Sequence, residues 1–224
     1  MIYCLFEQSG TFKNQFKSLG HDAQDFDILN DFGETDNVID LYSEITKAYG
    51  GGKSMFDNIK HEDLILAFFP CIRFEAQILL HFRGESRQQK NKKIKKKLET
   101  DLKLHSELHE NYCILTKLVI VCINKNLRLI VENPYSEQSY LSRYWACKPS
   151  IIDKDRSRRG DYYKKPTQYF FINIEPTNNI VMDYMEEVPT QKTIAKTSDK
   201  VQRSMISKEY AMRFIKEFIG VENI

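Results

Sequence analysis

The stretch DLILAFFPC, residues 63–71, places an apolar run directly before a proline and a cysteine. A second apolar run, Leu127 to Val131, is followed by Glu132-Asn133-Pro134. Both runs are short and continuous, which is typical of strands buried in an open α/β sheet. Ligand crevices form where such strands end. We therefore expect Cys71 and Glu132 to meet at this edge, where a thiol and a carboxyl group suit nucleophilic attack coupled to proton transfer.

Strands and helices alternate along the rest of the chain. Further strands are expected at residues 1–6, 23–28, 38–41 and 168–174, and helices at residues 12–19, 74–82, 98–123 and 207–219. This alternation predicts an α/β, Rossmann-like fold with a mostly parallel sheet and helices on both faces. A length of 224 residues with 42% hydrophobic content fits one domain, spanning residues 1–224, more easily than two. Residues 176–202 are polar and predicted to be irregular.

The basic residues are unevenly distributed. The formal net charge is only +2, but between Arg83 and Lys97 eight residues are Lys or Arg and Glu85 is the one acid. Alone, such a run is ordinarily a solvated helix face or a mobile loop, and beside a reactive cysteine it is equally a surface that neutralises the phosphates of a nucleic acid. We expect a basic mobile loop at residues 83–97. The candidate phosphate-binding residues are Arg83, Arg87, Lys90, Lys92, Lys93, Lys95, Lys96 and Lys97, with Arg159 from a second basic loop.

The cysteines and the apolar segments indicate the compartment. Five cysteines form an odd set without CxxC spacing, so neither a disulfide framework nor a zinc site is expected. His105 and His109 stand four apart but have no third ligand beside them, so we expect no metal site. The chain shows no signal-peptide pattern and no apolar segment long enough to cross a bilayer. A cytoplasmic protein without membrane contact is therefore expected.

The first strand-to-helix turn is a candidate cofactor site. Ser9-Gly10-Thr11 would let backbone N–H groups approach a ligand beside a helix N-terminus, and Asp27 is placed to accept hydrogen bonds from a ribose. One glycine in such a turn is common in α/β proteins, so a purely structural turn remains an alternative. Cys71 likewise has an alternative interpretation as a half-buried structural cysteine.

Taken in order, these segments resemble the DNA cytosine-5 methyltransferase superfamily, particularly its short phage-type members. The segments that carry the resemblance are LFEQSGTF (5–12), FDI (26–28), DLILAFFPC (63–71), IVENP (130–134), RRG (158–160) with KPT (165–167), and Arg203-Ser204. They follow the family's order and span nearly the whole chain.

The resemblance implies the fold of S-adenosylmethionine-dependent methyltransferases and methyl transfer from that cofactor to carbon 5 of cytosine in DNA. It implies that Cys71 adds to carbon 6 of a flipped base, that Glu132 hydrogen-bonds ring nitrogen 3 and that Arg158 supports the base. The cofactor-binding residues that it implies are Phe6, Ser9, Gly10, Thr11, Phe12, Asp27, Ile28, Asp40, Pro70 and Ser204.

Departures from the family's pattern keep two other functions open. Glu7-Gln8 stands where a glycine is usual, and the chain between Pro166 and Arg203 is too short for a target-recognition domain. A degenerate methyltransferase fold that binds nucleic acid or a protein partner without catalysis is therefore one alternative. The other is an amino-methyltransferase that uses Asn133-Pro134-Tyr135, but it leaves Cys71 without a function. Besides DNA, the expected partners are a protein partner or a homo-oligomer, and the sequence identifies neither.

Overall fold

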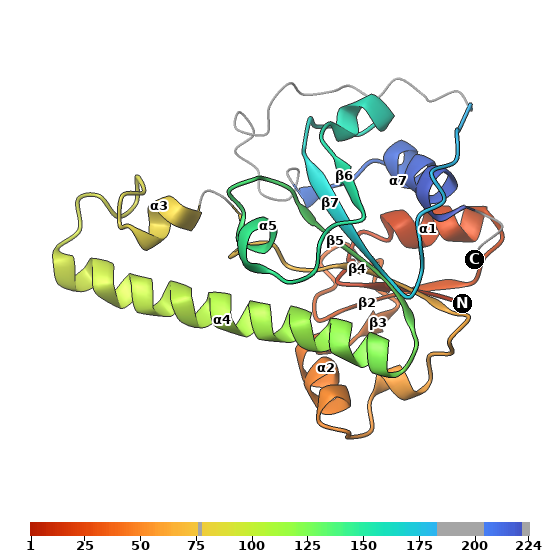
Figure 1. Cartoon of the computed structure of the whole chain (residues 1–224), viewed down its shortest axis with the longest axis horizontal. Coiled ribbons are helices and arrows are strands. Elements are labelled where there is room, and N and C mark those ends of the chain that lie inside the picture. Colours follow the sequence, from red (N-terminus) through yellow and green to blue (C-terminus); the bar gives the residue numbers. More distant parts are fainter. Residues whose placement is uncertain (76–77, 183–203, 221–224) are drawn as a thin grey trace.

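The computed structural model describes residues 1–75, 78–182 and 204–220, and a seven-stranded sheet runs through its centre. The strands are β1 (Ile2–Leu5), β2 (Ala23–Asp27), β3 (Asn37–Val38), β4 (Leu64–Phe68), β5 (Arg128–Pro134), β6 (Ile151–Asp153) and β7 (Thr167–Ile172). Their order across the sheet is β3-β2-β1-β4-β5-β7-β6. Neighbours from β3 to β5 run parallel, whereas β7 runs antiparallel to β5 and β6. The predicted α/β class with a mostly parallel sheet is thereby confirmed (Figure 1).

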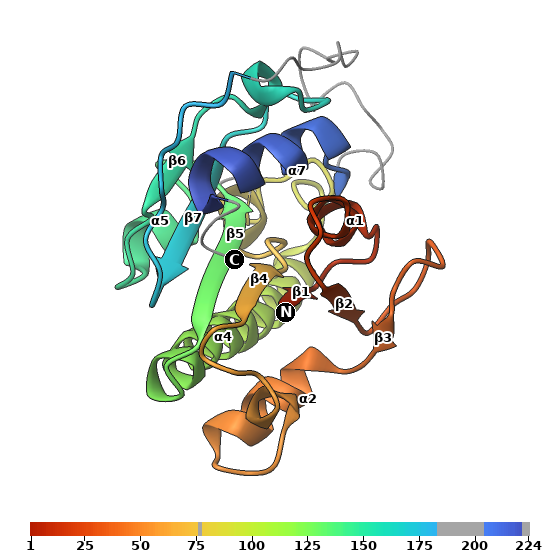
Figure 2. The same cartoon turned by 90° about the vertical axis from the view of Figure 1, so that its right-hand side faces the viewer.

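Helices pack on both faces of this sheet (Figure 2). The helices of the described residues are α1 (Thr11–Ser18), α2 (Leu41–Tyr49), α3 (Ile78–Phe82), α4 (Ile94–Asn124), α5 (Tyr140–Tyr144) and α7 (Lys208–Phe214), which continues as the π-helical turn η4 (Ile215–Ile219). Of these, α3 packs on α4 and lies away from the sheet (Figure 1). Successive side chains of β4 point to opposite faces. Leu64 and Leu66 pack with residues of α1 and α7, whereas Ile65 and Ala67 pack with residues of α2 and α4. At this coarse level the arrangement is Rossmann-like.

Helix α4 is 31 residues long and only its second part lies on the sheet. Its buried residues begin at Leu104, with one in each of the first turns and about two per turn from Ile114 to Cys122. Residues 94–103 extend beyond the sheet beside α3 (Figure 1). The structure therefore has a projecting arm, which we define as residues 78–103.

The structure corrects several predicted boundaries. The predicted mobile loop is wrong for residues 94–97, which form the first turn of α4, and backbone hydrogen bonds make residues 83–93 a series of turns. The strand expected at residues 38–41 ends at Val38, and Leu41 begins the unpredicted helix α2. Strand β6 and helix α5 were also not predicted. Of the segment 176–202, residues 183–202 lie outside the described ranges.

Within the described ranges, we find no helix with the length and apolar character needed to cross a membrane.

Candidate functional site

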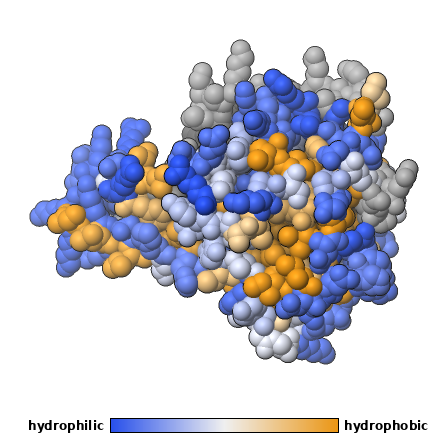
Figure 3. All heavy atoms as spheres, in the orientation of Figure 1, coloured by the Kyte–Doolittle hydropathy of each residue, from blue (hydrophilic) through white to orange (hydrophobic). Residues whose placement is uncertain are grey.

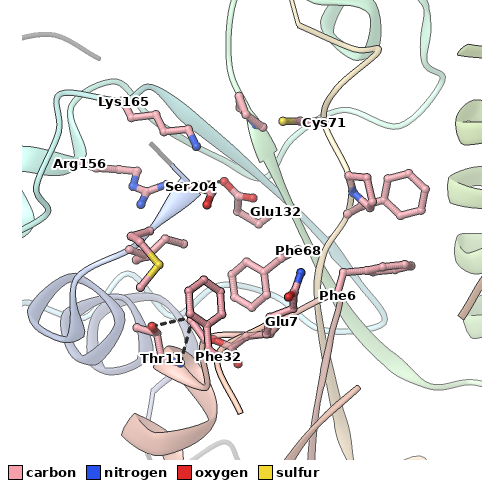
Figure 4. A pocket seen from close by; sticks show the side chains of 17 residues that line it. Phe6, Glu7, Thr11, Phe32, Phe68, Cys71, Glu132, Arg156, Lys165 and Ser204 are labelled. Atoms are coloured by element: carbon pink, nitrogen blue, oxygen red, sulfur yellow. Dashed lines mark hydrogen bonds and ion pairs between the residues drawn. The ribbon is translucent and has the colours of Figure 1, made fainter. Parts of the chain in front are cut away.

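A pocket lies where β1, β4 and β5 end, at the point where the chain reverses the direction in which it adds strands to the sheet. From β1 the chain moves to β2 on one side and later returns to β4 on the other, so β1 and β4 flank a topological switch point. The cavity measures about 230 Å³. Figure 4 shows the side chains that line it. It is lined by Phe6, Glu7, Gln8, Ser9, Thr11, Phe32, Phe68, Phe69, Pro70, Cys71, Glu132, Pro134, Arg156, Lys165, Ser204, Met205 and Ile206. The fold thus brings together Cys71, Glu132 and half of the predicted cofactor residues.

Parallel pairing explains why Cys71 and Glu132 share this pocket. Phe68 of β4 lies opposite Glu132 of β5, and Cys71 follows Phe68 by three residues. Both strands are buried along their length and end at the same edge. Asn133, which follows Glu132, donates its side-chain N–H to the carbonyl oxygen of Phe69 at 3.0 Å and so ties the two strand ends together.

Glu7 occupies the N-terminus of α1 from within the first loop. Its carboxylate accepts the backbone N–H groups of Phe12 at 2.7 Å and of Lys13 at 3.2 Å. Gly10, just before α1, has φ 62°, a left-handed conformation that favours glycine, and a Cβ there would meet the Asn14 side chain at 3.1 Å. The helix N-terminus is therefore satisfied by the protein's own carboxylate instead of remaining open to an external anion.

Burial controls the titration of Glu7. The side chain is almost wholly buried, and this desolvation raises its pKa from 4.5 to about 7, against the opposing effect of the two backbone N–H groups. The neighbouring carboxylate of Asp25 raises the pKa further. A carboxyl group on the wall of a pocket thus titrates near neutral pH.

Aromatic side chains form one wall of the pocket. Phe6, directly after β1, has φ 60°, which is unusual for a residue that is not glycine and marks local backbone strain. Its ring lies 5.2 Å from that of Phe69 in an edge-on arrangement. Phe32 reaches the pocket from the loop after β2, and its side chain is exposed. These rings offer apolar faces to a flat ligand.

Cys71 is held as a thiol in this structure. Its Sγ–H donates to Oε1 of Glu75 at 3.2 Å. Burial first, and the Glu75 charge second, raise the pKa of the Cys71 thiol to about 12, against an opposing effect of Lys165. Attack by Cys71 therefore requires that its proton be removed or that further positive charge approach, because the thiolate is the nucleophile.

The carboxylate of Glu132 faces an arginine that the sequence did not single out. Arg156, which is completely buried, places Nη1 at 3.8 Å from Oε1 of Glu132 and pairs through Nη2 with Asp161. Its guanidinium also lies over the Tyr210 ring, 4.7 Å from the centroid. Among the described residues, Oε1 of Glu132 accepts no hydrogen bond, although only 9% of its side chain is exposed. Oε1 of Glu132 is thus a buried oxygen beside the charge of Arg156, on a side chain that lines the pocket.

The structure does not bring Arg158 to this site. Its side chain is 83% exposed and lies 3.6 Å from Asp155 at the surface. Arg156, two residues earlier, lines the pocket instead. Three arginines within four residues gave the sequence no means to tell which one points inward. Each of the three pairs with an acid close by in the sequence, Arg156 with Asp161, Arg158 with Asp155 and Arg159 with Asp153, so the neighbouring acids give no signal either.

Other predicted cofactor residues lie away from the pocket. Phe12 is completely buried in the core, packed on Phe68 and Phe214. The side chain of Asp27 accepts the Leu29 N–H at 2.8 Å, within its own turn. Phe12 and Asp27 therefore stabilise the fold.

Two more of the predicted cofactor residues, Asp40 and Ile28, also lie outside the pocket lining. Asp40 caps α2 by accepting the Ser43 N–H at 3.2 Å. Ile28 is 59% exposed and, like Asp40, lies outside the cavity lining.

The predicted phosphate-binding residues divide into two groups. Those of the arm are exposed, apart from the half-buried Lys97. Arg159 is not available in the same way, because it lies 3.1 Å from Asp153 and makes two hydrogen bonds to Glu217. In the described part of the chain, no cluster of three or more His, Cys, Asp or Glu residues could hold a metal ion.

Comparisons with known proteins do not assign the chain to a family. No model of a known protein family matches the chain, and a search of curated proteins finds none with significant similarity.

Proposed function

We propose that this protein is an S-adenosylmethionine-dependent methyltransferase that acts on cytosine in DNA. The observation that carries the proposal is the shared pocket of Cys71 and Glu132 at the ends of β4 and β5, beside the switch point. A mostly parallel sheet with helices on both faces is also what the resemblance implies for the fold. The exposed basic residues of the arm support DNA as the substrate, because they can neutralise phosphates.

The first loop favours a cofactor without phosphate groups. Dinucleotides place a pyrophosphate at the helix N-terminus after β1, but here Glu7 already accepts the N–H groups of Phe12 and Lys13. S-adenosylmethionine has no phosphate, and its cationic end suits a carboxylate. Phe6, Glu7, Ser9, Thr11 and the exposed ring of Phe32 would hold it. When bound, it supplies an electrophilic methyl group.

The chain's own residues can then prepare the base. Glu75 accepts the Cys71 proton, and the sulfur forms a bond to carbon 6 of the cytosine. Glu132 carries a proton and donates it in a hydrogen bond to ring nitrogen 3, which stabilises the negative charge that this addition pushes into the ring. Once carbon 5 is methylated, loss of its proton to a base re-forms the ring double bond and expels the sulfur of Cys71. Arg156 is fixed by Asp161 and holds the Glu132 carboxylate at the pocket wall. The chemistry requires a flipped base, since neither side chain could reach one inside a duplex.

A second candidate is a protein of the same fold that binds nucleic acid without catalysis. It is favoured by one specific observation, the thiol of Cys71 with its pKa raised to about 12. The amino-methyltransferase alternative is weaker, because the amide of Asn133 is only 1% exposed and donates to Phe69. The Asn133 amide is therefore already hydrogen-bonded within the sheet.

The test is nucleoside analysis of DNA incubated with the protein and isotopically labelled S-adenosylmethionine. We expect label in 5-methylcytosine for the wild type and for Cys147→Ala, a matched cysteine variant outside the pocket. Cys71→Ala should bind the cofactor but transfer no label. Label in N4-methylcytosine would instead favour the amino-methyltransferase. If the protein binds DNA without the cofactor and no modified base is found in that DNA, the result would favour the non-catalytic protein.

A further inference from the structure

Lys165 lines the pocket, but the proposed reaction assigns it no role. Its side chain is half-buried and is directed into the pocket on the side of Cys71 and Glu132 (Figure 4). Among the described residues, its ammonium group forms no ion pair and no hydrogen bond. A pocket cation without an anion of its own is available to a negative charge that forms during a reaction.

The sheet holds the backbone of Lys165 in place. Strand β7 begins at Thr167 and pairs with the end of β5, where Glu132 lies. The backbone N–H of Tyr135 donates to the carbonyl oxygen of Pro166 at 2.9 Å, so the pairing continues just before the strand. Lys165 is therefore anchored beside the end of β5, while its flexible four-carbon stem lets the ammonium group adjust its position.

The charged groups around Cys71 act on its thiol in opposite directions. Burial raises the pKa of the thiol most, and the charges of Glu75 and Glu132 raise it as well. Lys165 is the group that lowers it. Arg156, the other cation among the pocket-lining residues, is already paired with Asp161. Lys165 is therefore the pocket cation that remains for Cys71.

We propose that Lys165 is a further catalytic residue, whose ammonium group contacts the sulfur of Cys71 and stabilises its thiolate. Glu75 accepts the proton of Cys71, so the negative charge moves from that carboxylate to the sulfur. When the sulfur forms its bond to carbon 6, the charge passes into the ring, and Lys165 keeps its own protons throughout. The place of this thiolate in methyl transfer rests on the proposed function, whereas the effect of Lys165 on the thiol does not.

A phosphate of bound DNA is the rival partner for this cation. Lys164, the preceding residue, is 61% exposed and lies 3.7 Å from Asp155, where a phosphate could reach it. Figure 3 shows strongly hydrophilic side chains over the arm, which carries further exposed lysines. Phosphates thus have cations to meet at the surface, while Lys165 lies in the pocket that only the flipped base would enter. Its position fits the sulfur better than it fits a phosphate.

The test is the rate at which iodoacetamide, an uncharged reagent, alkylates Cys71 at a slightly alkaline pH, measured by peptide mass spectrometry. Lys165→Gln removes the positive charge and should slow alkylation by about three- to tenfold, because the thiolate is the reacting form. Lys165→Arg keeps the charge and should retain most of the wild-type rate. Lys164→Gln is the matched control on a lysine outside the pocket lining, and it should change the rate by less than about twofold.

Equal alkylation rates for the wild type and Lys165→Gln would overturn the proposal. Equal slowing by Lys165→Gln and Lys165→Arg would overturn it too, because the charge would not be the cause. The fluorescence of the buried Trp145 checks that each variant keeps its fold.

Alkylation requires neither DNA nor S-adenosylmethionine, so it decides the role of Lys165 separately from the proposed function. A wild type that transfers no methyl group would refute that function and leave the alkylation result standing. With a wild type that does transfer the group, Lys165→Gln should lower kcat and leave the KM for DNA unchanged. A higher KM for DNA at unchanged kcat would assign Lys165 to a phosphate and overturn the proposal.

Discussion

Replacing Arg156 by methionine should destabilise the protein far more than the same change at Arg158. Arg156 is completely buried, and its removal leaves the carboxylates of Asp161 and Glu132 without their cation, at side-chain exposures of 1% and 9%. Breaking a buried ion pair from one side costs about 3–5 kcal/mol. Arg158 is 83% exposed and pairs only at the surface, so Arg158→Met should cost less than about 0.5 kcal/mol.

Urea unfolding followed by the fluorescence of the buried Trp145 measures this difference. Equal unfolding free energies for Arg156→Met and Arg158→Met would refute the buried pair.

Three further changes test other parts of the structure. Burial raises the pKa of Glu7 to about 7, above its ordinary 4.5, so the free energy of unfolding should fall as the pH rises through that window. Glu7→Gln should remove this fall, which is roughly 3 kcal/mol at its limit, in urea titrations across the window. The raised pKa of Cys71 should make its alkylation near pH 8 slower than that of a free thiol by on the order of a thousandfold. Glu75→Gln should increase the alkylation rate of Cys71, which peptide mass spectrometry measures. The double variant Lys92→Glu/Lys93→Glu should bind an oligonucleotide with a weaker dependence on salt than the wild type. In titrations at several salt concentrations, the slope of the logarithm of the binding constant against the logarithm of the salt concentration should be shallower by about 0.9 for each phosphate that the variant no longer neutralises. An unchanged slope would show that these lysines do not contact DNA.

The strands of the site could be predicted because their signal is local. An apolar run that stops at Pro70-Cys71 or at Glu132-Asn133 marks a buried strand and its end in the sequence itself. Parallel pairing then brings the two ends together. Strand β6 has only three residues and alternating exposure, so it gives no comparable signal.

Side-chain orientation could not be predicted in the same way. Asp27 and Asp40 stand at strand and helix ends, where an acid can contact a ligand or bind its own backbone, and the structure assigns both to the backbone. Arg156 is buried because Asp161 and Glu132 meet it from a later turn and from β5. Such a partnership depends on contacts between elements, which no local pattern in the sequence specifies.

The most direct test of the central claim is a trapping reaction on DNA that contains 5-fluorocytosine. Fluorine at carbon 5 cannot leave as the proton does, so an enzyme that adds Cys71 to carbon 6 and receives a methyl group at carbon 5 stays covalently bound. We predict a protein–DNA adduct that survives denaturation, requires S-adenosylmethionine and maps to the peptide containing Cys71. An adduct of equal yield from Cys71→Ala, or none from a wild-type protein that binds both DNA and cofactor, would contradict the account.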